Sequence, residues 1–199
     1  MVVARLRVAV LVSHTGSNFR ALHEASLRPG AGFEIGLVVS NNSGSQALAY
    51  AREQEIPHRH LSSHTHATAE ELDAALVEEL TARSVDLVVT AGYMKKLGPR
   101  TLASHGNRII NIHPALLPRH GGQGMFGSAV HEAVLASGDR VTGPSIHYVT
   151  AEYDAGEVIA RHEVPVLPDD TAESLAARVL AAEHRLLPEV VARIAAESA

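Results

Sequence analysis

The sequence of 199 residues contains no cysteine and no tryptophan, and only 4% of its residues are aromatic. The absence of cysteine excludes disulfide bonds, thiolate metal sites and cysteine nucleophiles. The scarcity of aromatic side chains leaves little material for the base-stacking platforms of single-strand nucleic-acid-binding proteins. Any chemistry must therefore come from other side chains.

The sequence also lacks a basic stripe and a long apolar run. The formal net charge is -5, with both signs interspersed, which argues against a nucleic-acid-binding surface. No apolar run approaches the roughly 18 residues that indicate a membrane span, and no cationic segment precedes an apolar run as in a signal peptide. We therefore expect a cytoplasmic protein without a nucleic-acid or membrane partner. An anionic small molecule, held by backbone amides, remains compatible with this composition.

The length and the 46% hydrophobic content suit a single domain with a substantial core. Apolar runs alternate with segments of helical periodicity, which predicts parallel strands with right-handed crossovers and a doubly wound, mostly parallel, Rossmann-like α/β sheet. The expected strands are 6–12, 35–39, 86–91 and 108–113, and the expected helices begin after Ser17, Gln46, Thr68 and Gly98. Ligands of such sheets bind beyond the carboxyl ends of the strands.

Beyond Gly143 the pattern changes to two successive strands, 145–150 and 158–166, joined by a turn at Asp154-Ala155-Gly156. We expect these strands to form an antiparallel extension of the sheet. A final helix follows, with Asp170 and Glu173 at capping positions and a break or kink before Pro188.

An amide, an imidazole and a carboxylate stand at the ends of apolar runs, at Asn111, His113 and Asp154. Asn111 and His113 are two residues apart on a strand, so their side chains point to the same face. Asparagine can donate a hydrogen bond to an oxyanion, histidine can transfer protons near neutral pH, and aspartate can hold a charged histidine. These three residues could move an acyl group. Without Asp154, the Asn-Ile-His-Pro run could equally be a hydrogen-bonded strand terminus.

The Asn111-Ile112-His113-Pro114 and Asp154-Ala155-Gly156 segments resemble the folate-dependent formyltransferases, and the resemblance extends from the first strand to the last helix. It implies the formyltransferase fold over residues 1–199, with a phosphate-binding part in 1–113 and a folate and catalytic part in 114–199. It also implies that Asn111, His113 and Asp154 form the catalytic trio.

The turn Ser13-His14-Thr15-Gly16-Ser17-Asn18 lies between an expected strand and helix, where free backbone N–H groups and the helix dipole favour an anion. It has neither the dinucleotide-binding nor the P-loop pattern. By itself it could be an ordinary turn with a Ser or Asn cap. The family resemblance implies that Gly16, Ser17 and Asn18, with the adjacent Thr15, bind a ribose phosphate.

The resemblance also implies a folate site and a site for the amine end of the second substrate. The implied folate residues are Met94, Lys95, Lys96, Leu97, Asn111, Tyr153 and Asp154, and the implied amine-end residues are Pro114 and Glu183. Without the resemblance, the 92–97 segment could be a strand-to-helix loop with solvated lysines. Glu183 could likewise be a solvated helix charge.

Two segments depart from the family pattern. The loop at Gly121–Gly127 is glycine-rich and differs from the family's Pro-Gly-x-His form, so its role is not given by the resemblance. An arginine expected beside Thr68 is replaced by Ala69, so either another cation helps to hold the anionic substrates or their affinity is lower.

Thirteen histidines raise the question of a metal site, above all at His58, His60, His64 and His66. These four lie in a polar segment that we expect to be a loop, without a helical His-x-x-x-His or an acidic partner at ligand spacing. We therefore expect no metal.

The family resemblance implies an activity: transfer of the formyl group of 10-formyltetrahydrofolate to the amine of 5-phosphoribosylglycinamide, in purine biosynthesis. The alternatives are hydrolysis of 10-formyltetrahydrofolate, transfer to another amine, or a non-catalytic module that binds a phosphate ligand. The sequence does not indicate an oligomeric state.

Overall fold

The computed structural model describes residues 5–198. The strands are β1 (Leu6–Val12), β2 (Phe33–Ser40), β3 (His58–His60), β4 (Leu87–Thr90), β5 (Ile109–His113), β6 (Val141–Thr142), β7 (Ser145–Tyr148), β8 (Val158–Arg161) and β9 (Val164–Pro165). The helices are α1 (Ser17–Ser26), α2 (Gln46–Glu53), α3 (Ala69–Ala82), α4 (Pro99–Ser104), α5 (Ser128–Ala136) and α6 (Ala172–Glu197).

Seven strands form one sheet in the order β3-β2-β1-β4-β5-β7-β8. The strands from β3 to β5 pair in parallel, whereas β7 and β8 pair antiparallel at the β5 edge. The predicted doubly wound sheet with an antiparallel extension is therefore confirmed. The carboxyl ends of β1, β4 and β5 meet at one edge, where the rule for such sheets places ligands.

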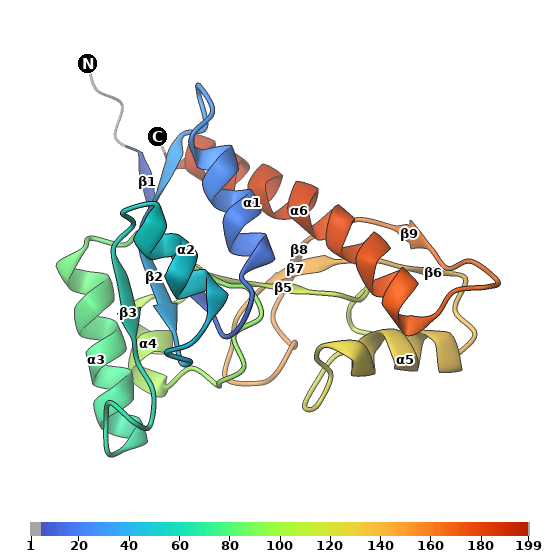
Figure 1. Cartoon of the computed structure of the whole chain (residues 1–199), viewed down its shortest axis with the longest axis horizontal. Coiled ribbons are helices and arrows are strands. Elements are labelled where there is room, and N and C mark those ends of the chain that lie inside the picture. The colour runs from blue at the N-terminus through green and yellow to red at the C-terminus, as the bar shows by residue number, and fades with distance from the viewer. Residues whose placement is uncertain (1–4, 199) are drawn as a thin grey trace.

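The central strand β1 shows why both faces of the sheet are covered by helices. Successive strand residues point to opposite faces. Val8, Val10 and Val12 pack into one core with residues of α1, α2 and α6. Ala9 and Leu11 pack into a second core with Leu76 and Leu80 of α3. Figure 1 shows α1 and α6 side by side on one face of the sheet and α3 with α4 away from them.

Polar groups fix the beginnings of two helices. The Thr68 hydroxyl accepts from the Glu71 backbone N–H, and the Glu71 carboxylate accepts from the Thr68 backbone N–H, as the capping-box spacing predicts. Asp73, buried within α3, accepts from the backbone N–H groups of Arg100 and Thr101 at the start of α4. A Cβ on Gly98 would meet the Asp73 carboxylate at 2.2–2.6 Å, so glycine is required there.

The C-terminal region differs from the sequence prediction in three ways. The expected strand 158–166 is divided into β8 and β9, and β9 pairs with β6 in a separate two-stranded sheet. Thr171, with Ser174, caps α6 in place of Asp170 and Glu173. The helix α6 also continues through Pro188 to Glu197, so the alternative of a break is wrong and that of a kink stays a prediction.

Two short strands and one helix were not predicted. The helix α5 and the short strands β3 and β6 have no strong periodic signal in the sequence. Val134 of α5 packs with Val164, Leu175 and Val179 in a third core, beside the N-terminal half of α6. This packing, rather than local periodicity, holds α5 in place. No helix within residues 5–198 is long and apolar enough to cross a membrane.

Candidate active site

Strand β5 carries Asn111 and His113 to the carboxyl edge of the sheet. The alternate residues Ile110 and Ile112 pack into the core beneath α1 and α6, so Asn111 and His113 point together to the other side. Both line one cavity, as the two-residue spacing predicts. His113 is buried, with 3% of its surface exposed.

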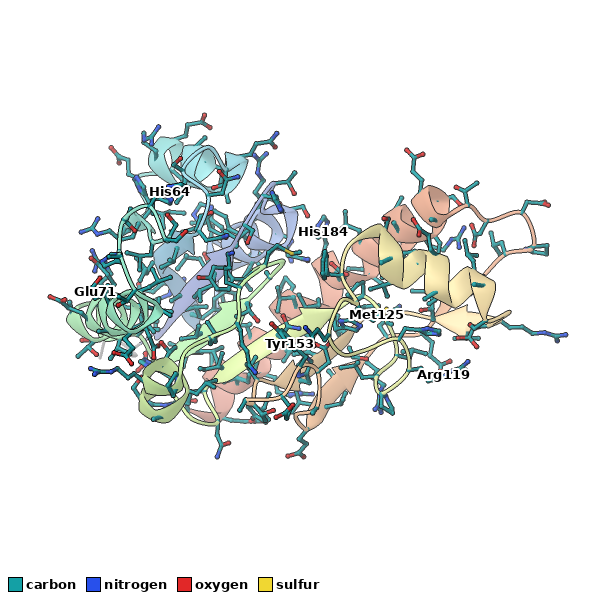
Figure 2. All side chains as sticks on the ribbon, turned by 90° about the horizontal axis from the view of Figure 1, so that it is seen from below. His64, Glu71, Arg119, Met125, Tyr153 and His184 are labelled. Carbon is teal, nitrogen blue, oxygen red and sulfur yellow. The ribbon has the colours of Figure 1, made fainter. Side chains whose placement is uncertain are left out.

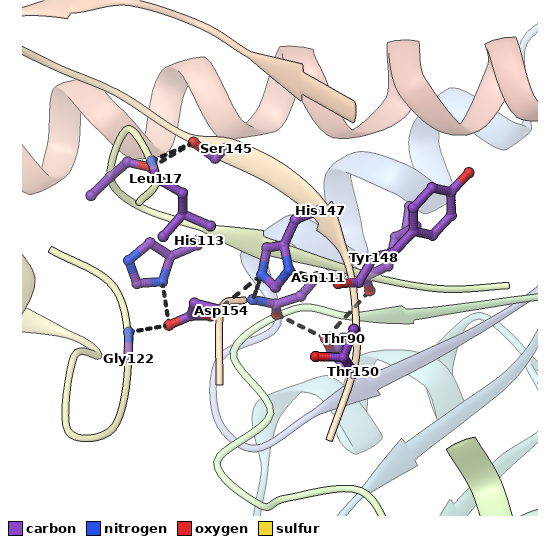
Figure 3. A network of polar contacts seen from close by, with 12 residues as sticks. Thr90, Asn111, His113, Leu117, Gly122, Ser145, His147, Tyr148, Thr150 and Asp154 are labelled. Atoms are coloured by element: carbon purple, nitrogen blue, oxygen red, sulfur yellow. Dashed lines mark hydrogen bonds and ion pairs between the residues drawn. The ribbon is translucent and has the colours of Figure 1, made fainter. Parts of the chain in front are cut away.

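Asp154 reaches the same cavity from the turn between β7 and β8. Its backbone has a φ of 52°, a left-handed conformation that aspartate tolerates better than most residues. A Cβ on Gly156 would lie 1.8 Å from the Tyr148 carbonyl oxygen, so only glycine allows the turn to close. The Asp154 Oδ2 atom lies 3.6 Å from His113 Nδ1 and accepts a hydrogen bond of 2.9 Å from the Gly122 backbone N–H (Figure 3).

The contacts of His113 fix one of its protons. Nε2 lies 2.8 Å from the carbonyl oxygen of His120, which can only accept, so Nε2 carries a proton and donates it. Nδ1 faces Asp154 at a distance too long for a hydrogen bond. A proton on Nδ1 would therefore remain available to a ligand in the cavity.

Burial lowers the pKa of His113, while the Asp154 carboxylate and the His120 carbonyl oppose that shift. The effect of Asp154 has the predicted direction. Burial is the larger effect, so the free protein holds His113 mainly neutral near pH 7.

His147 is a member of this network that the sequence did not reveal. It lies directly opposite Asn111 in the β5–β7 pairing and is buried. Its Nε2 atom is 3.1 Å from Asn111 Nδ2 and 3.3 Å from Asp154 Oδ1, and its Nδ1 atom is 2.9 Å from the Tyr148 carbonyl oxygen. Only the unpredicted strand register brings it to the site.

The Asn111 amide is held on its oxygen side by Thr90, whose hydroxyl donates to Oδ1 at 2.8 Å. The nitrogen Nδ2 therefore lies next to His147, with one N–H directed to that ring and a second available to a ligand.

The side chain of Asp154 is ionised in this network. Burial alone would raise the pKa of Asp154, but the side-chain contact with His147, the hydrogen bond from the Gly122 N–H and the charges of His113 and His147 hold that pKa below its ordinary value. The site thus pairs an ionised carboxylate with two imidazoles.

The cavity has a volume of about 1050 Å³ and collects most of the predicted site residues. Its lining includes Asn18, Met94, Lys95, Lys96, Leu97, Asn111, His113, Pro114, Tyr153, Asp154 and Glu183. Thr15, Gly16 and Ser17 are not among the lining residues.

Comparison with known proteins agrees with this arrangement. The model of the formyl transferase family matches residues 6–191. The chain belongs to the formyl transferase family. It is 43% identical over 195 residues to the chloroplastic phosphoribosylglycinamide formyltransferase of Vigna unguiculata, covering 98% of this chain and 62% of that protein. It is 31% identical to the phosphoribosylglycinamide formyltransferase of Haemophilus influenzae, covering 93% of this chain and 85% of the relative.

A solved structure resembles the whole fold. The crystal structure of phosphoribosylglycinamide formyltransferase from Brucella melitensis superposes with a TM-score of 0.90 at 38% identity, covering 97% of each chain. The formyl transferase fold that the sequence motifs implied is therefore confirmed.

In this formyl transferase the start of α1 has no side-chain cap. The N-cap is Gly16, with a φ of 70°, so the alternative of a Ser or Asn cap is wrong. A Cβ on Gly16 would also lie 2.7 Å from the Ala47 Cβ, so the turn needs glycine for two reasons. The first amides of α1 are left without a capping side chain, which suits an anion.

Glu183 of α6 contacts a residue of α1 at the cavity. It is 7% exposed and accepts a hydrogen bond of 2.6 Å from Asn18 Nδ2, so its interpretation as a solvated helix charge is wrong. Burial raises the pKa of Glu183 to about 7, and the Asn18 hydrogen bond opposes this shift. Near neutral pH its carboxyl group can therefore accept or donate a hydrogen bond.

The glycine-rich loop forms one wall of the cavity through residues 122–127. Behind it, His131 of α5 also lines the cavity, is buried, and has no hydrogen-bond partner for Nδ1 within residues 5–198. The contacts of this loop were not predicted from sequence, because it departs from the family pattern, and His131 was not predicted, because α5 was missed.

Lys95 and Lys96 are the lysine or arginine side chains that line the cavity in the described part of the chain. The Lys96 ammonium lies 5.3 Å from the centre of the Tyr153 ring, a cation–π contact across the cavity. Ala69, where the family pattern has arginine, is exposed on α3 and does not line the cavity.

The four clustered histidines lie away from this site. His58 and His60 belong to the edge strand β3, so their placement in a loop is wrong. Figure 2 shows His64 on the same side of the molecule as Glu71, away from Met125 and Arg119. Within residues 5–198 no group of three or more His, Cys, Asp or Glu side chains could hold a metal ion. Metal independence stays a prediction.

Proposed function

We propose that this chain transfers the formyl group of 10-formyltetrahydrofolate to the amine of 5-phosphoribosylglycinamide. The observation that carries the proposal is the meeting of Asn111, His113 and Asp154 in one large cavity. The names of the relatives support the choice of substrates. Because the chain spans 62% of the length of the Vigna relative, the activity of that whole protein is proposed rather than transferred.

The reaction begins with attack of the neutral amine on the formyl carbon. A C–N bond forms, and the electron pair of the carbonyl bond moves to oxygen. The free N–H of Asn111 can donate to this oxyanion, and His113 Nδ1 can also donate once it has taken up a proton, in a buried site where such donors are most effective.

The proton released by the attacking amine must reach the nitrogen of the leaving tetrahydrofolate. Asp154 and His113 together can accept that proton, since an ionised carboxylate faces a mainly neutral imidazole. The oxyanion adds negative charge beside His113 and favours its protonated form at this stage. Collapse of the oxyanion then breaks the bond to the leaving nitrogen, which takes the proton. No covalent enzyme intermediate is needed.

The ribonucleotide and the folate are assigned to different parts of the site. The ribonucleotide phosphate is assigned to the uncapped amides of Gly16–Asn18, with Thr15 adjacent and Glu183 and Pro114 toward the amine end. The folate is assigned to the wall formed by Met94–Leu97 and Tyr153. Asn111 and Asp154 lie where the two ligands would meet.

One assay separates this function from its alternatives: the loss of 10-formyltetrahydrofolate is followed with and without 5-phosphoribosylglycinamide. Transfer predicts loss only with the ribonucleotide and one formylated product per folate released. Loss without the ribonucleotide would favour a hydrolase, and loss only with another amine would replace the acceptor. No loss under any condition would favour a non-catalytic phosphate-binding module.

The division into a phosphate-binding part (1–113) and a folate and catalytic part (114–199) stays a prediction. The cytoplasm is the proposed location, whereas the Vigna relative is named as chloroplastic. Fractionation of cells that produce the chain would test it.

A further inference from the structure

Three consecutive residues, His120, Gly121 and Gly122, contact both members of the His113–Asp154 pair. The carbonyl oxygen of His120 accepts from His113 Nε2 at 2.8 Å. Two residues later, the N–H of Gly122 donates to Asp154 Oδ2 at 2.9 Å (Figure 3). One short backbone segment therefore fixes a proton on the histidine and the orientation of the carboxylate.

Gly121 lets this segment approach the pair closely. A Cβ there would lie 2.5 Å from the Leu117 side chain and 3.3 Å from the Asp154 Cβ. Any displacement of the segment therefore changes its contacts with both catalytic side chains.

His120 has a backbone conformation that needs support from its side chain. Its φ is 53°, in the left-handed region that a histidine adopts only at a cost. The side chain is anchored, because Nε2 lies 2.7 Å from Asp139 Oδ2 and the ring is mostly buried. The other oxygen of Asp139 pairs with Arg119. The contact with His120, first among several causes, lowers the pKa of Asp139, which is thus ionised.

We propose that Arg119, His120 and Asp139 form a positioning device that holds the His120 carbonyl on His113 and the Gly122 amide on Asp154. None of the three side chains lines the cavity. They act through the backbone of residues 120–122. The inference that they affect catalysis rests on the proposed function, whereas their effect on His113 does not.

The test removes the Asp139 carboxylate, which holds the side chain of His120. Asp139→Ala removes the partner of His120, and Asp139→Asn keeps an oxygen that can accept from His120 while it removes the charge. Glu79→Ala is a matched control, since Glu79 also pairs with two cations, Arg59 and Arg83, but lies on α3 outside the cavity.

The first readout is the NMR titration and tautomer of His113 in protein without substrates. The His120 carbonyl raises the pKa of His113, so Asp139→Ala should lower that pKa and reduce the Nε2–H tautomer. Asp139→Asn should lie closer to the parent, which separates geometry from the loss of a charge. The groups that act on His113 are Asp154, His147, His120 and the nearby His131, and none is changed by these variants.

The second readout is steady-state kinetics. Asp139→Ala should lower the turnover number by up to roughly 100-fold, the loss that a displacement of about 1 Å can cause. The Michaelis constants should change much less, Asp139→Asn should restore most of the rate, and Glu79→Ala should retain it.

An unchanged His113 titration and tautomer in folded Asp139→Ala would overturn the proposal, whatever the substrates prove to be. If Asp139→Ala fails to fold, His120→Ala, which removes the other partner of the same contact, and Arg119→Ala are titrated in its place. If the titration and tautomer of His113 in both variants were identical to those of the parent, the proposal would be rejected. Failure of the proposed reaction would appear separately, as absence of formyl transfer in the unaltered protein.

Discussion

Strand β5 and the turn between β7 and β8 both place side chains in the same cavity, but they fix those side chains in different ways. Asn111 and His113 are placed by a central strand whose neighbours β4 and β7 pair with it on both sides. Asp154 is placed by a turn that depends on Gly156, on a left-handed backbone and on one hydrogen bond from Gly122. Position on the strand is set by the sheet as a whole, whereas position on the turn is set by a few contacts.

This comparison predicts different sensitivities. A change to a strand residue should affect only the group that is removed. A change to the turn, or to residues 120–122 that support it, should also alter the side chains that these residues contact, because each contact there fixes more than one side chain.

The largest expected effect is that of Asp154→Asn. The substitution keeps the size but removes the proton acceptor, so the turnover number should fall by roughly 10²–10⁴-fold. Substrate dissociation constants should change much less. The measurement is steady-state kinetics together with direct binding of each substrate. Glu157→Gln, in the same turn but exposed and outside the cavity, serves as the control and should retain the rate.

A smaller loss is expected from Asn111→Ala on the strand. Removal of one oxyanion donor costs on the order of 10²–10³-fold in turnover. Because the sheet fixes its neighbours, the NMR titration of His113 should stay close to that of the parent. A His113 pKa shifted as much as in Asp154→Asn would contradict the distinction between strand and turn.

Glu183→Gln should change the pH dependence of stability. The folded-state pKa of Glu183 is about 7, above the unfolded value near 4.5, so the folded protein binds more protons between these pH values. The parent should lose stability as pH rises through this window, by on the order of 3 kcal/mol. Glutamine does not ionise, so the variant should lack this loss. Urea unfolding without substrate at pH 5 and pH 8 measures the free energy of unfolding at each pH. An equal change in that free energy for both proteins would refute a raised pKa of Glu183.

Chelation is expected to have the smallest effect. No cysteine is present, and residues 5–198 contain no cluster of three metal-ligating acidic or histidine side chains. The rate of formyl transfer should be unchanged after treatment with a chelator and dialysis. A lost activity that one divalent ion restores would show that a ligand set has been overlooked.

The parallel part of the fold was predictable because its signals are local. The apolar run of β1 and the Thr68 capping box mark their elements without reference to the rest of the chain. The positions of Asn111 and His113 follow from the period of a strand and from the family motif.

The remaining features depend on contacts between distant residues. His147 reaches Asn111 only through the register of β5 with β7, and Glu183 is buried only because α6 lies against α1. The support of His113 by His120 requires a left-handed residue and an ion pair across the loop. No periodicity encodes these contacts, so they could not be predicted from single segments.

The central claim is that Asp154 acts on His113 as its electrostatic partner. It is tested most directly by NMR titration of His113 in the parent and in Asp154→Asn. Burial already lowers the pKa of His113 and Asp154 opposes that shift, so removal of the Asp154 charge should lower the pKa further. An unchanged His113 pKa, together with near-normal turnover in the variant, would leave Asp154 as a structural turn residue and contradict the account.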